Sequence, residues 1–214
     1  MQFALNYSPE ALALTGDGTI QIDLYKLPDW PDLVREVAAQ HPLYVHFGLV
    51  AGTPVERDDA LIEWALASTA TQFVNVHLGV WHELLPDTDI LDLSPGTIDT
   101  VRERIRADLK TLVARFGADR VIAENVFTLD RSGGKAMLAG SLPDVLRDVS
   151  EDAGCGLLLD TAHAKIAAFT HGTPYQDYIS ALPVGHLREL HVTGVGFRQD
   201  GRQGDHLPMR ADDW

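Results

Sequence analysis

The sequence predicts an α/β fold in which parallel strands alternate with helices. Short apolar runs alternate with amphipathic stretches along most of the chain, a rhythm typical of strands joined by helical crossovers. Residues 156–160 contain an unbroken apolar run up to Leu159, as expected for a strand covered on both faces. The 214 residues, 45% of them hydrophobic, suffice for one substantial core. This alternation alone does not distinguish a closed barrel from an open sheet.

The elements follow from periodicity and from residues that begin or end helices. We expect strands over residues 3–7, 20–25, 43–47, 73–78, 121–125, 156–160 and 187–192. Helices are expected over residues 31–40, 58–67, 98–116 and 142–153, with further helical material up to residue 182. The clearest is 98–116, where Val101, Ile105, Leu109 and Leu112 recur at helical spacing before Gly117. We expect a turn at residues 16–18 and loops over 81–95, 131–140 and 193–214.

The charge of the chain limits its partners. The net charge is −14, and no cluster of Lys and Arg is visible. Such a surface repels phosphate backbones and anionic lipids, so we expect a small-molecule or peptide substrate, with neither nucleic acid nor a membrane as partner. Cys155 is the only cysteine, and the N-terminus has no apolar signal core, so we expect a cytoplasmic protein.

Histidines and carboxylates gather where the predicted strands end. The residues at the ends of the third to seventh strands, or directly after them, are His46, His77, Glu124, Asp160, His163 and His191, and Asp205 and His206 follow in the last loop. The carboxyl ends of parallel barrel strands converge on one mouth, where such folds place their sites. We therefore predict that these eight residues form one site.

Divalent metal ions would explain this combination. One histidine at a strand end is more often structural, Glu124 alone could cap a helix, and so could Asp160. Burying several imidazoles and carboxylates together without a metal would cost several kcal/mol. Imidazole ligands favour iron, zinc or manganese, and more than four ligands imply two or three ions. We assign the candidate catalytic roles, as ligand or base, to Glu124 and His163, and a substrate contact to Trp81.

Two sets of motifs resemble known families. Residues 159–164, Leu-Asp-Thr-Ala-His-Ala, resemble the Asp-Thr-x-His-Ala signature of endonuclease IV type enzymes, which belong to the xylose isomerase-like barrels. The resemblance implies a (β/α)8 TIM barrel with metal ligands at His46, His77, Glu124, Asp160, His163 and His191. Asp205 and His206 are similar to the later Asp-x-His pair of that family, but here the two residues are adjacent.

The second half of the chain is more similar to the multinuclear non-haem iron oxidases. The similar segments are residues 154–160, 178–183 and 187–194, together with 41–48. That resemblance implies an enzyme that modifies cysteines of ribosomally made peptides with two or three irons. His163 departs from this family, which commonly carries Asn shortly after the sixth-strand Asp.

Both families take a last glutamate ligand from an eighth strand, whereas we count seven. Either the chain lacks that strand or the count misses one. We expect a single TIM-barrel domain over residues 1–214 that is incomplete at its C-terminal end.

The favoured function is a multinuclear metalloenzyme, similar to the oxidases or to sugar isomerases and epimerases. One alternative is a phosphodiesterase of endonuclease IV type, which the net charge opposes. The other is a non-catalytic barrel that binds a metal or a metabolite. The sequence leaves the reaction and the oligomeric state open.

Overall fold

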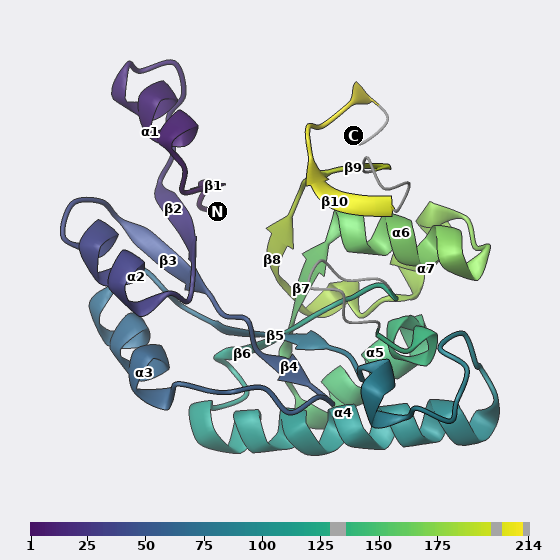
Figure 1. The fold of residues 1–214 in the computed structure, drawn as a ribbon. Coiled ribbons are helices and arrows are strands. Elements are labelled where there is room, and N and C mark those ends of the chain that lie inside the picture. The colour runs from purple at the N-terminus through teal and green to yellow at the C-terminus, as the bar shows by residue number, and fades with distance from the viewer. Residues whose placement is uncertain (129–135, 198–202, 212–214) are drawn as a thin grey trace. The chain divides into compact units, whose positions relative to one another are not determined.

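A computed structural model describes residues 1–128, 136–197 and 203–211 of the chain (Figure 1). The chain divides into two units. The first unit contains residues 1–49 and 56–74, and the second contains residues 50–55 and the chain from residue 75 onward. None of the described helices combines the length and apolar character of a membrane-spanning helix.

The first unit is a three-stranded parallel sheet with helices in its connections. The strands are β1 (Ala4–Asn6), β2 (Leu24–Pro28) and β3 (Leu43–His46), in that order, and the helices are α1 (Pro9–Gly16), α2 (Pro31–Ala38) and α3 (Asp59–Ser68). Leu27 and Val45 are buried, as is Val34 of α2. Asp58 caps α3, because its carboxylate accepts a hydrogen bond from the backbone N–H of Leu61 at 2.9 Å. His46 is the last residue of β3.

The second unit contains a five-stranded sheet whose strands follow chain order. The strands are β4 (Val50–Ala51), β5 (Val74–Leu78), β6 (Val121–Glu124), β7 (Gly156–Asp160) and β8 (Leu187–His191), and the helices are α4 (Pro95–Phe116), α5 (Pro143–Ala153), α6 (Thr161–His171) and α7 (Tyr175–Ala181). β6 pairs with β7 and β7 with β8, both in parallel. All five residues of β7 are buried, as the apolar sequence predicts for a strand covered on both faces.

Strands and helices alternate through both units, which confirms the α/β class and is the order of a (β/α)8 TIM barrel. The predicted stripe of α4, Val101, Ile105, Leu109 and Leu112, is buried. Two ion pairs, Arg102 with Asp148 at 3.4 Å and Arg106 with Asp152 at 2.7 Å, join α4 to α5, which lies beside it in Figure 1.

The structure differs from the expected elements near the N-terminus. Residues 9–16 form α1, where we expected no helix, and Ser8 caps it by accepting a hydrogen bond from the Ala11 N–H at 3.1 Å. The second strand begins at Leu24 rather than at residue 20. The reason is local, because the Ile20 N–H donates to the carbonyl of Leu14 in the last turns of α1.

The expected loop over residues 193–214 contains two strands. β9 (Gly194–Phe197) and β10 (Gln203–Leu207) pair in antiparallel orientation, and both contact α6. A Cβ at Gly194 would lie 2.3 Å from the carbonyl oxygen of Pro208. Only glycine therefore allows the backbone at residue 194 to lie so close to the backbone at residue 208. The part of the predicted 131–140 loop that is described, from Ala136 on, includes the 3₁₀ turn η2 (Leu138–Ser141).

Candidate metal centre

Four of the predicted ligands lie at or next to the ends of strands in the five-stranded sheet. Glu124, Asp160 and His191 are the last residues of β6, β7 and β8, and His77 is the residue before the last in β5. Asp160 lies directly opposite His191 in the parallel register of β7 and β8. The sheet therefore brings these side chains to one edge, as the sequence predicts.

Glu124 lies between two imidazoles. Its carboxylate is buried, with Oε2 3.2 Å from Nε2 of His77 and Oε1 3.5 Å from Nδ1 of His163. Each carboxylate oxygen thus faces a different histidine.

His163 enters the centre from the first turn of α6. Asp160 caps this helix by accepting a hydrogen bond from the His163 backbone N–H at 2.9 Å. The Nδ1 atom of the imidazole lies 2.8 Å from the backbone carbonyl oxygen of Asn125. Its Nε2 atom lies 3.0 Å from the Asp205 carboxylate and 4.0 Å from Oδ2 of Asp160.

The surroundings of His163 favour its protonated form. Burial by itself lowers the pKa of His163, but the negative charge of Asp160, the hydrogen bond to Asp205 and the charges of Glu124 and Asp205 outweigh it and raise the pKa to about 9. Without a metal, His163 is therefore an imidazolium at neutral pH, and both ring nitrogens donate hydrogen bonds. A metal ion bound at Nε2 would replace that proton.

His191 faces Asp160 and is held by a residue to which the sequence prediction gave no role. The Nδ1 atom of His191 lies 3.8 Å from Oδ2 of Asp160, and its Nε2 atom lies 2.7 Å from Oε1 of Glu189. Glu189 precedes His191 by two positions in β8, so both side chains extend from the same face of the strand. That spacing was the available signal for Glu189 in the sequence.

Asp205 and His206 extend from β10. Asp205 is 3% exposed and contacts His163, whereas His206 is exposed and lies 3.3 Å from Oδ2 of Asp205 through its Nε2 atom. His206 has a φ of 53°, in the left-handed region that non-glycine residues rarely adopt. The hairpin therefore brings a third buried carboxylate to His163.

The donor set fits a divalent metal ion. One ligand atom from each of Glu124, Asp160 and His163 lies within 4.8 Å of the others. Glu124 and Asp160 are each 1% exposed and Asp205 is 3% exposed, so three carboxylates are buried around one imidazolium. Buried charges that are not balanced are costly, and bound cations would supply the missing positive charge.

The two remaining predicted site residues are His46 and Trp81. His46 ends β3, in the first unit. Trp81 follows β5, where its backbone N–H donates to Oγ1 of Thr53 at 2.9 Å and its backbone forms an isolated bridge with Ala136. A substrate contact by Trp81 stays a prediction.

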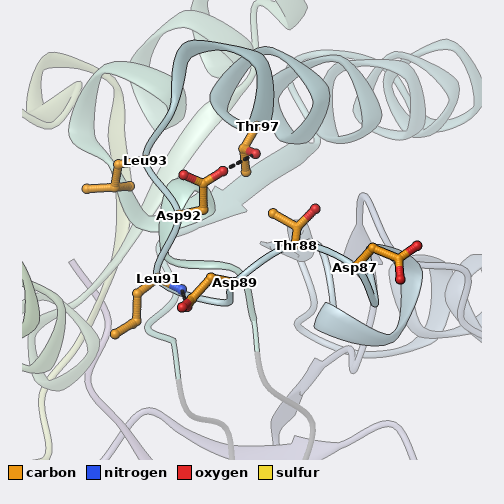
Figure 2. A pocket seen from close by; sticks show the side chains of 7 residues that line it. All are labelled: Asp87, Thr88, Asp89, Leu91, Asp92, Leu93 and Thr97. Carbon is orange, nitrogen blue, oxygen red and sulfur yellow. Dashed lines mark hydrogen bonds between the residues drawn. The ribbon is translucent and has the colours of Figure 1, made fainter.

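A pocket of about 460 Å³ opens in the segment between β5 and α4 (Figure 2). Its lining combines three aspartates with leucines and threonines: Asp87, Thr88, Asp89, Leu91, Asp92, Leu93 and Thr97. Asp92 accepts a hydrogen bond from the hydroxyl group of Thr97, drawn in Figure 2, and another from the hydroxyl group of Ser94. The pocket shares no lining residue with the metal centre.

The chain is similar to proteins of several bacteria. A UPF0276 protein of Rhizobium meliloti is 37% identical over 68 residues, which cover 32% of this chain and 22% of that protein. A UPF0276 protein of Acaryochloris marina is 24% identical over 172 residues, which cover 75% of this chain and 58% of that protein. The matched segments thus span less than two thirds of the length of these relatives.

Among solved structures, the chain is similar to a D-psicose 3-epimerase from Clostridium cellulolyticum H10 in complex with D-tagatose. The identity is 14%, the TM-score is 0.48, and the alignment covers 89% of this chain and 72% of that chain. The model of the family described as RiPP precursor modification enzyme MbnB/TglH/ChrH matches residues 26–212, and the chain therefore belongs to this family.

Proposed function

We propose that this chain is a metal-dependent enzyme that modifies a ribosomally made peptide by oxidation and binds at least two divalent metal ions. The family description supports the peptide substrate. The observation that carries the metal dependence is the group of Glu124, Asp160 and His163, whose ligand atoms lie within 4.8 Å of one another.

The geometry of the donors supports two neighbouring ion sites. One site would take its ligands from His77 and Glu124, and the other from Asp160, Asp205 and Nε2 of His163. Glu124 would connect the two sites, because its ligand atom lies within 4.8 Å of those of Asp160 and His163. His191, opposite Asp160, is placed to complete the second site. Mixed nitrogen and oxygen donors suit iron, zinc or manganese better than magnesium or calcium.

The surrounding residues have separable tasks. Bound ions would supply Lewis acidity and, with iron, the capacity for electron transfer. The chain itself buries the carboxylates from water, orients His191 through Glu189 and holds a proton on Nδ1 of His163. Oε1 of Glu124, which faces Nδ1 of His163, would be the carboxylate oxygen available to accept a proton near the centre.

The metal dependence is tested by elemental analysis of protein purified without oxygen. We expect about two or more equivalents of iron, zinc or manganese in the wild type, and clear loss of metal in His191→Ala with an unchanged circular dichroism spectrum. The exposed His186→Ala is the matched control, and we expect it to keep the wild-type metal content. Wild-type metal content in His191→Ala would contradict the assignment.

The reaction is tested by incubating the iron-loaded protein with cysteine-containing precursor peptides and oxygen. We expect oxygen consumption and a change in peptide mass that depend on the metal. Phosphodiester cleavage by a zinc form, without oxygen consumption, would support a hydrolase instead. A protein that binds no metal would overturn the proposal.

A further inference from the structure

Asn125 connects two of the proposed metal ligands, although nothing in the sequence analysis assigned it a role. It follows β6 directly and is 1% exposed. Its side-chain amide donates to the backbone carbonyl of Asp160 at 3.0 Å, and its side-chain oxygen accepts from the backbone N–H of Asp160 at 2.8 Å. Its own backbone carbonyl accepts a hydrogen bond from Nδ1 of His163 at 2.8 Å.

The two side-chain hydrogen bonds extend the pairing of β6 and β7 beyond the point where the backbone ladder stops. The ladder between these strands ends with Glu124 opposite Leu158. Asp160 lies two residues further along, where the side-chain amide of Asn125 takes the place of a backbone partner. A carboxylamide suits this task because it offers one donor and one acceptor side by side, as a peptide group does. The ends of the two strands are thereby fixed relative to each other.

The backbone hydrogen bond determines which ring nitrogen of His163 can bind a metal. A carbonyl oxygen can only accept, so Nδ1 of His163 carries the hydrogen. Nε2 is then the nitrogen left for an ion, and it faces the carboxylates of Asp205 and Asp160 at 3.0 and 4.0 Å. A partner on the opposite ring nitrogen is the usual way in which proteins orient metal-binding histidines.

We propose that Asn125 is a positioning residue of the metal centre: it fixes Asp160 relative to His163 and makes Nε2 the ligand atom of His163. This inference rests on the proposed function. Asn125 itself is not assigned as a ligand, because both ends of its side-chain amide bond to Asp160 and its backbone carbonyl accepts from His163. A buried amide that only stabilised the fold would change stability without changing metal affinity or the bound nitrogen.

The test compares three variants by titration with cobalt(II) against a chromophoric chelator. Asn125→Ala removes both side-chain hydrogen bonds, whereas Asn125→Asp keeps an acceptor for the Asp160 N–H and loses the donor. Tyr178→Phe is the matched control. It removes one buried hydrogen bond to a backbone carbonyl, that of Ser141, among residues that hold no proposed ligand.

We expect cobalt to bind Asn125→Ala about 10- to 100-fold more weakly than the wild type, the usual effect of losing a partner that orients a ligand. The cobalt affinity of Asn125→Asp should lie between those of the wild type and Asn125→Ala. The affinity of Tyr178→Phe should stay within about twofold of the wild type. Thermal melts of the metal-free proteins show which variants are folded. If Asn125→Ala does not fold, Asn125→Asp alone decides, and we expect its cobalt affinity to be more than about threefold below that of the wild type.

Nitrogen-15 spectra of the zinc form show which nitrogen of His163 binds the metal, a property that does not depend on the stability of the fold. In the wild type we expect zinc on Nε2 of His163 and a slowly exchanging proton on Nδ1. In Asn125→Ala we expect that proton to exchange faster, because the carbonyl that holds it is no longer fixed.

Several results would overturn the inference. Wild-type cobalt affinity in the folded Asn125 variants, zinc on Nδ1 of His163, or an equal loss of affinity in Tyr178→Phe would each do so. A wild type that binds neither cobalt nor zinc would overturn the proposed function and this inference with it. That outcome is distinct from one in which the wild type binds metal and the Asn125 variants bind it equally well.

Discussion

Three buried carboxylates surround the imidazole of His163, and this changes how pH acts on the metal-free protein. The pKa of His163 is raised to about 9, whereas a histidine in the unfolded chain titrates near its ordinary value of about 6.5. The raised pKa contributes stability that is fully present below pH 6.5 and is lost as the pH rises from 6.5 through 9.

We therefore predict that the metal-free protein loses on the order of 2 kcal/mol of unfolding free energy between pH 6.5 and 9 because of this one group. Urea denaturation in the presence of a chelator measures it. His163→Gln should remove most of this pH dependence, and the same dependence in wild type and variant would show that His163 is not its source.

Glu189 is the second residue whose effect is local. Its carboxylate lies 2.7 Å from Nε2 of His191, and the other ring nitrogen, Nδ1, faces Asp160. Glu189→Ala should weaken metal binding about 10- to 100-fold, and Glu189→Gln, which keeps an acceptor for the imidazole N–H, should lose less. Glu151→Ala, an exposed change on α5, is the control. Equal metal affinity for all three variants in a chelator competition would refute this role.

At the scale of elements, α6 and α7 are joined by a half-buried histidine outside the metal centre. His171, the last residue of α6, stacks on Tyr178 of α7 with ring centroids 6.2 Å apart, and its Nε2 atom lies 3.0 Å from Oγ of Ser141. Burial lowers the pKa of His171, and a hydrogen bond at Ser141 opposes this in part. The neutral imidazole is therefore the form that this packing accepts.

For a base with a lowered pKa, the unfolded chain takes up the proton first as the pH falls. The contribution of His171 to stability is thus complete above pH 6.5 and declines below it. We predict that His171→Gln reduces the loss of unfolding free energy between pH 7 and 5, whereas the exposed His186→Gln does not. Chemical denaturation at several pH values measures this, and equal acid sensitivity of wild type and His171→Gln would contradict it.

Elements with a strong local signal could be predicted, and the others could not. α4 was predictable because its four buried residues recur at helical spacing along one face. α1 had a signal, Ser8 followed by Pro9, but its apolar residues are consecutive rather than spaced along one face, and only Ala11 is buried. β9 and β10 had none, because their pairing depends on a close approach at Gly194 rather than on alternating apolar residues. Tertiary contacts decide such elements.

At the scale of the whole molecule, the site could be predicted where parallel strands bring their ends together. His77, Glu124, Asp160 and His191 lie at or next to strand ends, and the order of the strands alone makes them neighbours. The residues that orient these ligands could not be found in this way. Asn125 acts through the backbone of a strand 35 residues later, a contact that leaves no spacing pattern in the sequence.

Asp160 links the metal centre to the stability of the whole molecule, because it serves both as proposed ligand and as the N-cap of α6. These two roles can be separated. Asn caps a helix about as well as Asp, whereas its neutral amide is a poorer ligand than a carboxylate. Asp160→Asn should therefore keep the cap and lose metal affinity, and Asp160→Ala should lose both.

The measurement is the thermal midpoint with a chelator and with added zinc. A ligand at about 100 times its Kd stabilises a folded protein by about 2.7 kcal/mol, so zinc should raise the midpoint of the wild type by several degrees. Without metal, Asp160→Asn should melt at or above the wild-type midpoint, since one buried negative charge is gone, and zinc should raise its midpoint little or not at all. Asp58→Asn, the same exchange at the N-cap of α3, should keep the full response to zinc, because Asp58 serves as a cap and not as a ligand. A full zinc response in Asp160→Asn would show that Asp160 only caps α6 and would remove it from the metal centre.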